Sequence, residues 1–190
     1  TATEEINKLS SVQGLSGETT SSMHYNKSFQ RLFIGYENGL LEVVDNDGTI
    51  TISSDIVSFN QSGRKSINHI KEFNNKLYLS TPFGIVVYDI EKLEFGDTYF
   101  IGPSGEEISV NQTAIFNNEI YAVTPNFGIR KGNLSNPNLI DYQQWQVFDS
   151  NSWKKIVSFN NQLVAYKSDN RIYKHNGFSF TEILTKSFIL

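Results

Sequence analysis

Short apolar runs rich in β-forming residues recur along the chain, and the polar tripeptide Phe-Asn-Asn precedes three of them. The three copies begin at Phe73, Phe116 and Phe159, so successive copies are 43 residues apart. A period of this length is typical of one propeller blade. Because an apolar run follows each copy immediately, we expect the tripeptide to mark the same turn entering the same strand in every repeat.

The pattern within a repeat is strand, turn, strand, with four strands to a unit. The predicted strands cover 23–25, 31–36, 40–44 and 49–53; 67–73, 77–81, 85–90 and 98–101; 112–116, 120–124, 128–131 and 145–148; 153–159, 163–166, 171–174 and 180–184. Glu37-Asn38-Gly39 predicts a hairpin, since Asn-Gly supplies the two positive-φ positions of a type I′ turn. Glycines at 84 and 128 occupy the matching turns of the next two repeats.

The fold class that this pattern predicts is all-β, a β-propeller with about four four-stranded blades. The run Gly84–Tyr88 is nearly all apolar, which in a sheet indicates burial on both faces, as between stacked blades. A β-sandwich is the alternative, but it would show cleaner alternation. We expect one propeller domain over residues 1–190, with blades at about 21–56, 67–101, 110–148 and 153–184, and an outer strand and linker in 1–20.

The ends of the chain suggest that the ring continues beyond it. Glu5–Leu9 resembles an outer strand whose blade is missing, and Phe188–Leu190 resembles the start of a new strand. Open arrays leave sheet edges that recruit other chains. We therefore expect a piece of a larger propeller, for example one with seven blades.

Charge and composition narrow the possible partners. The chain has 16 basic and 20 acidic residues and a net charge of −4, without a basic stripe, which disfavours nucleic-acid binding. It has no apolar stretch near 18 residues, so we expect no membrane-spanning segment. It has no cysteine, which removes thiol chemistry and disulfides.

Catalytic, metal-binding and cofactor-binding motifs are not recognisable, and we expect no enzyme activity, metal or cofactor. His24, His69 and His175 fall at different repeat positions and lack partners at ligand spacing. Asp45–Gly48 resembles the opening of a calcium loop, but Ile56 stands at the twelfth position, where a carboxylate is needed. A hairpin turn is the expected structure there.

The longest departure from the repeat is the insertion 133–144, which leads into Trp145. Long loops on rigid repeat scaffolds often carry binding residues. Tyr142 and Trp145 are therefore candidates for a recognition loop. The alternative is that the aromatic side chains cap the edge of the blade.

The segment Leu32–Val44, with Gly14–Gly17 upstream, resembles the periplasmic propeller repeats of Bacteroidetes envelope proteins. Among these it is most similar to the PorZ-type N-terminal β-propeller family of the type IX (Por) secretion system; the other blades match only generically. The resemblance implies a non-enzymatic protein of the cell envelope, exported to the periplasm or outer-membrane surface. It further implies protein partners in the secretion machinery, such as a sortase, and a role in cargo secretion and attachment.

Two functional alternatives remain. The resemblance implies a C-terminal sorting domain, which we do not expect within residues 1–190, so contact with lipopolysaccharide or another glycan through that domain is not carried over. The sensor propeller of a hybrid two-component regulator shares the repeat and would bind a glycan. A propeller glycosidase or lyase is the weakest alternative, because no pair of acids recurs at inward-facing strand positions.

Overall fold

The computed structural model describes residues 8–61 and 63–185, and in these residues sixteen strands form four antiparallel sheets. Blade 1 contains β1 (Thr20–Asn26), β2 (Arg31–Tyr36), β3 (Leu41–Val44) and β4 (Ile50–Ser53). Blade 2 contains β5 (His69–Phe73), β6 (Lys76–Thr81), β7 (Gly84–Asp89) and β8 (Glu94–Tyr99). Blade 3 contains β9 (Gln112–Phe116), β10 (Glu119–Thr124), β11 (Gly128–Asn133) and β12 (Gln146–Asp149). Blade 4 contains β13 (Trp153–Phe159), β14 (Gln162–Lys167), β15 (Arg171–His175) and β16 (Phe180–Thr185).

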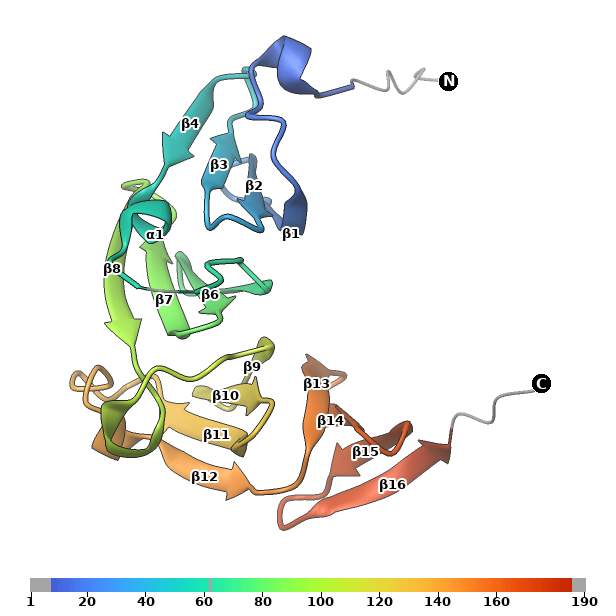
Figure 1. The fold of residues 1–190 in the computed structure, drawn as a ribbon. Helices are drawn as coiled ribbons and strands as arrows, with labels where there is room; N and C mark the ends of the chain where they lie inside the picture. Colours follow the sequence, from blue (N-terminus) through green and yellow to red (C-terminus); the bar gives the residue numbers. More distant parts are fainter. Residues whose placement is uncertain (1–7, 62, 186–190) are drawn as a thin grey trace, which may run out of the picture.

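The blades stand side by side along an arc, with their strands in chain order from the inside outward (Figure 1). β1 lies beside β5, β5 beside β9, and β9 beside β13, so these four inner strands line the concave side. The helical elements are short: η1 (Ser11–Gln13), α1 (Asp55–Ser58), η2 (Pro103–Gly105) and η3 (Tyr142–Gln144). This arrangement confirms the predicted all-β propeller with four four-stranded blades.

The Phe-Asn-Asn repeat forms the turn between the first two strands of blades 2, 3 and 4. In blade 2, Phe73 pairs with Lys76, which leaves Asn74 and Asn75 as a two-residue loop with φ values of 49° and 57°. The other two copies have the same conformation. Asparagine tolerates this left-handed region, which a type I′ turn needs at both central positions. The prediction of one repeated turn entering one repeated strand is confirmed.

The type I′ turn predicted at Asn38-Gly39 is wrong. Asn38 is absent from the positive-φ residues, and only Gly39 has a positive φ, of 91°. The Tyr36 amide donates to the Leu40 carbonyl at 3.0 Å, so the loop holds three residues. A side chain at Gly39 would lie 2.6 Å from Ile56. Close packing against α1 therefore selects glycine here.

Several predicted boundaries also differ from the structure. The last strand of blade 2 was expected at 98–101 but is β8, which begins earlier because Leu93 takes a positive φ of 58° and closes a short turn onto Asp89. Helix α1 was not anticipated. Of the outer strand expected at 5–9, residues 5–7 lie outside the described residues, and Lys8 and Leu9 are not in a strand. The strand start expected at 188–190 also lies outside the described residues.

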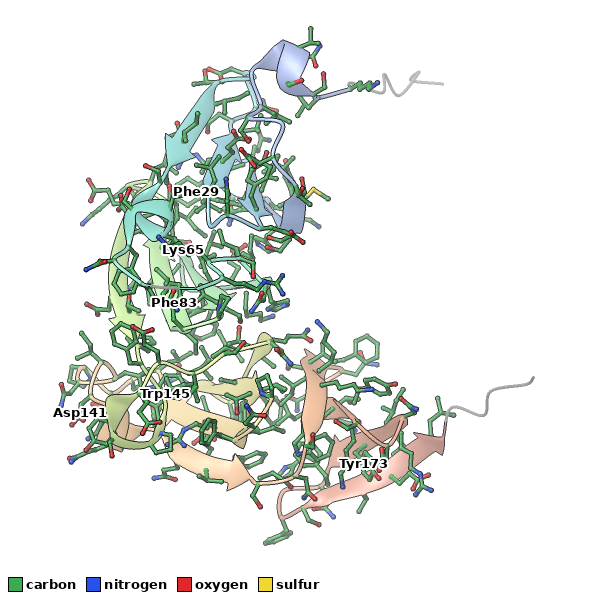
Figure 2. All side chains as sticks on the ribbon, viewed as in Figure 1. Phe29, Lys65, Phe83, Asp141, Trp145 and Tyr173 are labelled. Atoms are coloured by element: carbon green, nitrogen blue, oxygen red, sulfur yellow. The ribbon has the colours of Figure 1, made fainter. Side chains whose placement is uncertain are left out.

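Apolar side chains fill the spaces between neighbouring blades (Figure 2). β7 is buried from Gly84 to Tyr88, which confirms that this strand is covered on both faces. Phe33 and Leu77 join blades 1 and 2, Tyr78 and Ile120 join blades 2 and 3, and separate clusters of the same kind join blades 3 and 4. Each sheet therefore shields an apolar face of the next, which positions the inner strands rigidly.

Candidate functional site

A polar cavity of about 540 Å³ lies on the concave side of the arc, near the first residues of the inner strands. Residues from all four blades or their linkers line it: Thr20, Ser21, Glu37, Arg64, Ser66, Asn68, Asn111, Lys154 and Lys155. We call this the axial cavity.

The 43-residue repeat explains why these residues converge. Asn68, Asn111 and Lys154 occupy the same repeat position in blades 2, 3 and 4. His69, Gln112 and Lys155 follow them, again at one repeat position. Because equivalent residues of adjacent blades lie side by side at the axis, the sequence places two short polar rows there.

Two of the lining side chains hold neighbouring blades together. The Asn68 amide Nδ2 donates to the Val110 carbonyl at 2.9 Å, while Asn68 Oδ1 accepts from the Ser66 hydroxyl at 2.7 Å. The Ser21 hydroxyl donates to the Ile67 carbonyl at 2.8 Å. These groups are occupied by structural hydrogen bonds, so they shape the wall of the cavity.

The cations of the axial cavity outnumber its acids. Arg64, Lys154 and Lys155 line it, whereas Glu37 is its one carboxylate. Among the residues that the structure describes, ion pairs form at Arg31, Lys131, Arg171 and His24 but at none of these three cations. Lys154 Nζ lies 3.4 Å from Asn170 Oδ1 and 5.4 Å from the centroid of the Tyr166 ring.

His69 lies beside the cavity, close to several positively charged side chains. Burial is the main cause that lowers its pKa to about 4, and the charges of Lys155, Lys71 and His24 contribute to this shift in the same direction. Its Nε2 lies 3.5 Å from Gln112 Nε2, and its Nδ1 is buried without a hydrogen-bond partner. The imidazole is therefore neutral at pH 7.

The two residues predicted to form a recognition loop lie in different surroundings. Trp145 is only 4% exposed; its ring centroid lies 5.8 Å from that of Tyr99, and its Nε1 donates to the Leu139 carbonyl at 2.9 Å (Figure 2). Tyr142 is half-buried beside Gly105. The structure thus brings neither residue to the axial cavity, and their role in recognition stays a prediction.

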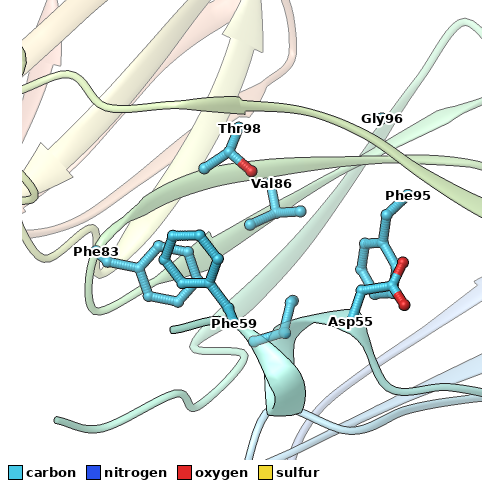
Figure 3. Close-up of a pocket in the computed structure, with 8 residues that line it drawn as sticks. Asp55, Phe59, Phe83, Val86, Phe95, Gly96 and Thr98 are labelled. Atoms are coloured by element: carbon cyan, nitrogen blue, oxygen red, sulfur yellow. The ribbon is translucent and has the colours of Figure 1, made fainter. Parts of the chain in front are cut away.

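A second, smaller cavity of about 250 Å³ lies between α1 and β8 (Figure 3). Phe59 and Phe83 stack on one side of it with ring centroids 5.1 Å apart, and Asp55 and Phe95 lie on the other. Most of its lining belongs to the apolar cluster that joins blades 1 and 2. Its aromatic rings therefore serve the packing between blades 1 and 2.

The remaining sequence candidates are structural. Asp45–Gly48 is the hairpin turn between β3 and β4, in which Thr49 N donates to Asp47 Oδ1 at 2.9 Å. Over residues 8–61 and 63–185, no group of three His, Cys, Asp or Glu side chains is placed to hold a metal ion. Within the same ranges, no helix is long and apolar enough to cross a membrane.

Four four-stranded sheets, arranged with their first strands side by side around the axial cavity, define the class of this protein as a β-propeller. The family described as the type IX secretion system PorZ N-terminal beta-propeller domain matches residues 1–146. The chain belongs to this family.

Solved structures show the same fold. PorZ of Porphyromonas gingivalis, described as an essential bacterial surface component of the type-IX secretion system, matches with a TM-score of 0.82 and 21% identity over 94% of this chain. The extracellular domain of the putative hybrid two component system BT4673 from B. thetaiotaomicron matches with a TM-score of 0.65 and 16% identity over 92% of this chain. The computationally designed Ika4 protein matches with a TM-score of 0.62 and 12% identity over 85%.

The coverage of these relatives differs. This chain spans 24% of the PorZ chain, 23% of the BT4673 chain and 93% of the Ika4 chain. A comparison with curated protein sequences gave no match.

Proposed function

We propose that this chain is a non-enzymatic scaffold within a cell-surface component of the type IX secretion system, where it binds other proteins of the machinery and supports cargo secretion and attachment. The observation that carries this proposal is the family match over residues 1–146. The description of the P. gingivalis relative as a surface component supports a place in the cell envelope. A rigid array of blades that presents loops at both ends suits such a role.

We further propose that the outer face of blade 4 seats another blade of the parent protein. Four of its side chains stand at repeat positions whose equivalents in blade 3 are buried against blade 4. The pairs, blade 4 first, are Val157 and Ala114, Val164 and Tyr121, Tyr166 and Val123, and Ile172 and Ile129. On blade 4 these positions line an open groove of about 380 Å³, and Val157 is 48% exposed.

The chemistry of that face supports a blade as its occupant. Val164 and Tyr166 alternate with Leu163 and Ala165, which are buried against blade 3. Blade 4 therefore has the two-sided apolar pattern of an internal sheet, with one side covered and one bare. Coverage of only 24% of the PorZ chain agrees with a longer parent.

The secretion role is tested by an in-frame deletion of the segment in the gene of the parent protein. We expect less cargo at the cell surface and more in the periplasm than in the parent strain. Surface labelling and immunoblotting of fractionated cells measure the two amounts. The level of the shortened parent is measured in the same samples, so that loss of cargo is scored only where the parent persists. Unchanged surface cargo with a stable shortened parent would contradict the proposal.

The alternative is a glycan-sensing propeller of a hybrid two-component regulator. The likeness to BT4673 favours it at the level of the fold. The two functions differ in their outputs: a sensor deletion would abolish a transcriptional response to a glycan while leaving cargo at the surface. Transcript profiling of the deletion strain therefore separates them.

A further inference from the structure

Three cations and one carboxylate line the axial cavity, so positive charge is in excess there. Its three cations point to a negatively charged ligand, and the guanidinium of Arg64 alone offers five N–H donors. The side-chain amide of Asn111 also lines the cavity, and Asn111 is half-buried. Glu37 is the one carboxylate among the lining residues.

In the described residues Arg64 and Lys155 make no cation–π contact, whereas Lys154 Nζ lies 5.4 Å from the centroid of the Tyr166 ring. The salt bridges of residues 8–61 and 63–185 engage other basic residues, so Arg64 and Lys155 keep their charge uncompensated. Lys155 also acts on the neighbouring imidazole of His69, whose protonated form it disfavours.

Oxyanions are the ligands that such a site recognises. A phosphate or carboxylate group has only acceptor oxygens, and hydrogen bonds from Arg or Lys to it are about twice as strong as neutral ones. A nucleic acid is a poorer fit, because the cavity is one hollow rather than a long basic stripe and the whole chain carries a net charge of −4.

We propose that the axial cavity binds the oxyanion group, phosphate or carboxylate, of a small ligand, with Lys155 and Arg64 as the main charged contacts and Lys154 and Asn111 as further donors. Asn68 and Ser66 hold the wall in place through their own hydrogen bonds. All four blades or their linkers contribute to the lining of the site, so binding would also fasten neighbouring blades together. This inference is independent of the secretion role.

The proposal is tested by titrating the full chain, labelled with ¹⁵N, with inorganic phosphate and separately with citrate at constant ionic strength. We expect saturable shifts at the amides of Asn111 and Lys155. The Lys155→Gln variant should raise the Kd about tenfold, as loss of one charge-assisted hydrogen bond implies. A response to phosphate alone identifies phosphate as the ligand group, and a response to citrate identifies carboxylate.

The matched control is Lys92→Gln, an exposed lysine in the turn between β7 and β8. It should leave the Kd unchanged. Arg64→Gln provides a second site variant, and circular dichroism confirms that each variant keeps the fold. The proposal is overturned if neither anion gives saturable shifts, or if Lys92→Gln weakens binding as much as Lys155→Gln does.

Discussion

His24 and Glu72, from the inner strands of blades 1 and 2, meet with Nε2 and Oε2 2.5 Å apart. The other carboxylate oxygen of Glu72 accepts from Asn26 Nδ2 at 2.8 Å, and Asn26 is 1% exposed. One carboxylate therefore satisfies two side chains of the adjacent blade. The contact adds polar specificity to a junction that is otherwise apolar.

Glu72→Ala should lower the free energy of unfolding by about 2 kcal/mol, because it leaves the buried Asn26 amide unsatisfied. Urea denaturation followed by tryptophan fluorescence measures the change. Glu91→Ala, at an exposed turn position, is the control and should have an effect within about 0.5 kcal/mol. Equal effects of the two substitutions would show that the junction does not depend on this carboxylate.

The turn conformation at Asn75 gives a second prediction. Its φ of 57° suits glycine and strains a β-branched residue. Asn75→Val should cost about 1–2 kcal/mol of stability, whereas Asn75→Gly should stay within a few tenths. Chemical denaturation of both variants measures this, and a Val variant as stable as the Gly variant would refute the type I′ assignment.

Gly128 makes a third, sterically severe prediction. A Cβ at this position would lie 2.0 Å from the Asp149 carbonyl oxygen, and φ is 69°. Gly128→Ala should cost at least about 3 kcal/mol, because the β11–β12 ladder must shift. Gly48 has a similar φ of 86° but open space around it, so Gly48→Ala should cost only about 1 kcal/mol. Thermal unfolding of the two variants tests the difference.

His69 predicts how stability depends on pH. Its folded pKa of about 4 lies below the ordinary value near 6.5, so the unfolded chain binds more protons between these values. The contribution of His69 to the free energy of unfolding should be fully present above pH 6.5. It should be lost as the pH falls toward 4, and the loss should be on the order of 3 kcal/mol. Burial also lowers the pKa of His175, which adds a loss of the same sign.

The variant His69→Asn isolates the contribution of His69. It should flatten the loss of stability between pH 6.5 and 4 relative to the unchanged chain, measured by urea denaturation at a series of pH values. The remaining slope belongs to the other titrating groups. An unchanged slope in the variant would contradict the burial of a neutral imidazole.

Local signals explain how much of the fold the sequence predicted. The Asn-Asn turns at 74–75 and the apolar strands after them are set by neighbouring residues, so they are visible without a structure. The loop at Gly39 was assigned the wrong turn type because its geometry depends on packing against Ile56, which lies 17 positions along the chain. β8 was misplaced for a related reason, since Leu93 adopts an unusual φ that its residue type does not announce.

The axial cavity was missed although part of it carried a signal. Asn68, Asn111 and Lys154 each stand five residues before a Phe-Asn-Asn copy, so the same 43-residue step would have gathered them. Arg64 has no such signal, because it lies in a linker between blades. Tyr142 and Trp145 drew attention through loop length and aromatic character, which do not reveal that Trp145 is buried.

In this fold each sheet covers the face of the sheet before it, and the reactivity of an introduced thiol measures the burial of that face directly. The chain has no cysteine, so Ala114→Cys and Val157→Cys place one thiol at the same repeat position of blades 3 and 4. With Ala114 1% and Val157 48% exposed, we predict that the thiol at 114 reacts with a maleimide at least about a hundredfold more slowly than the thiol at 157 under native conditions. Equal rates in folded protein would contradict the stacking of blade 4 on blade 3.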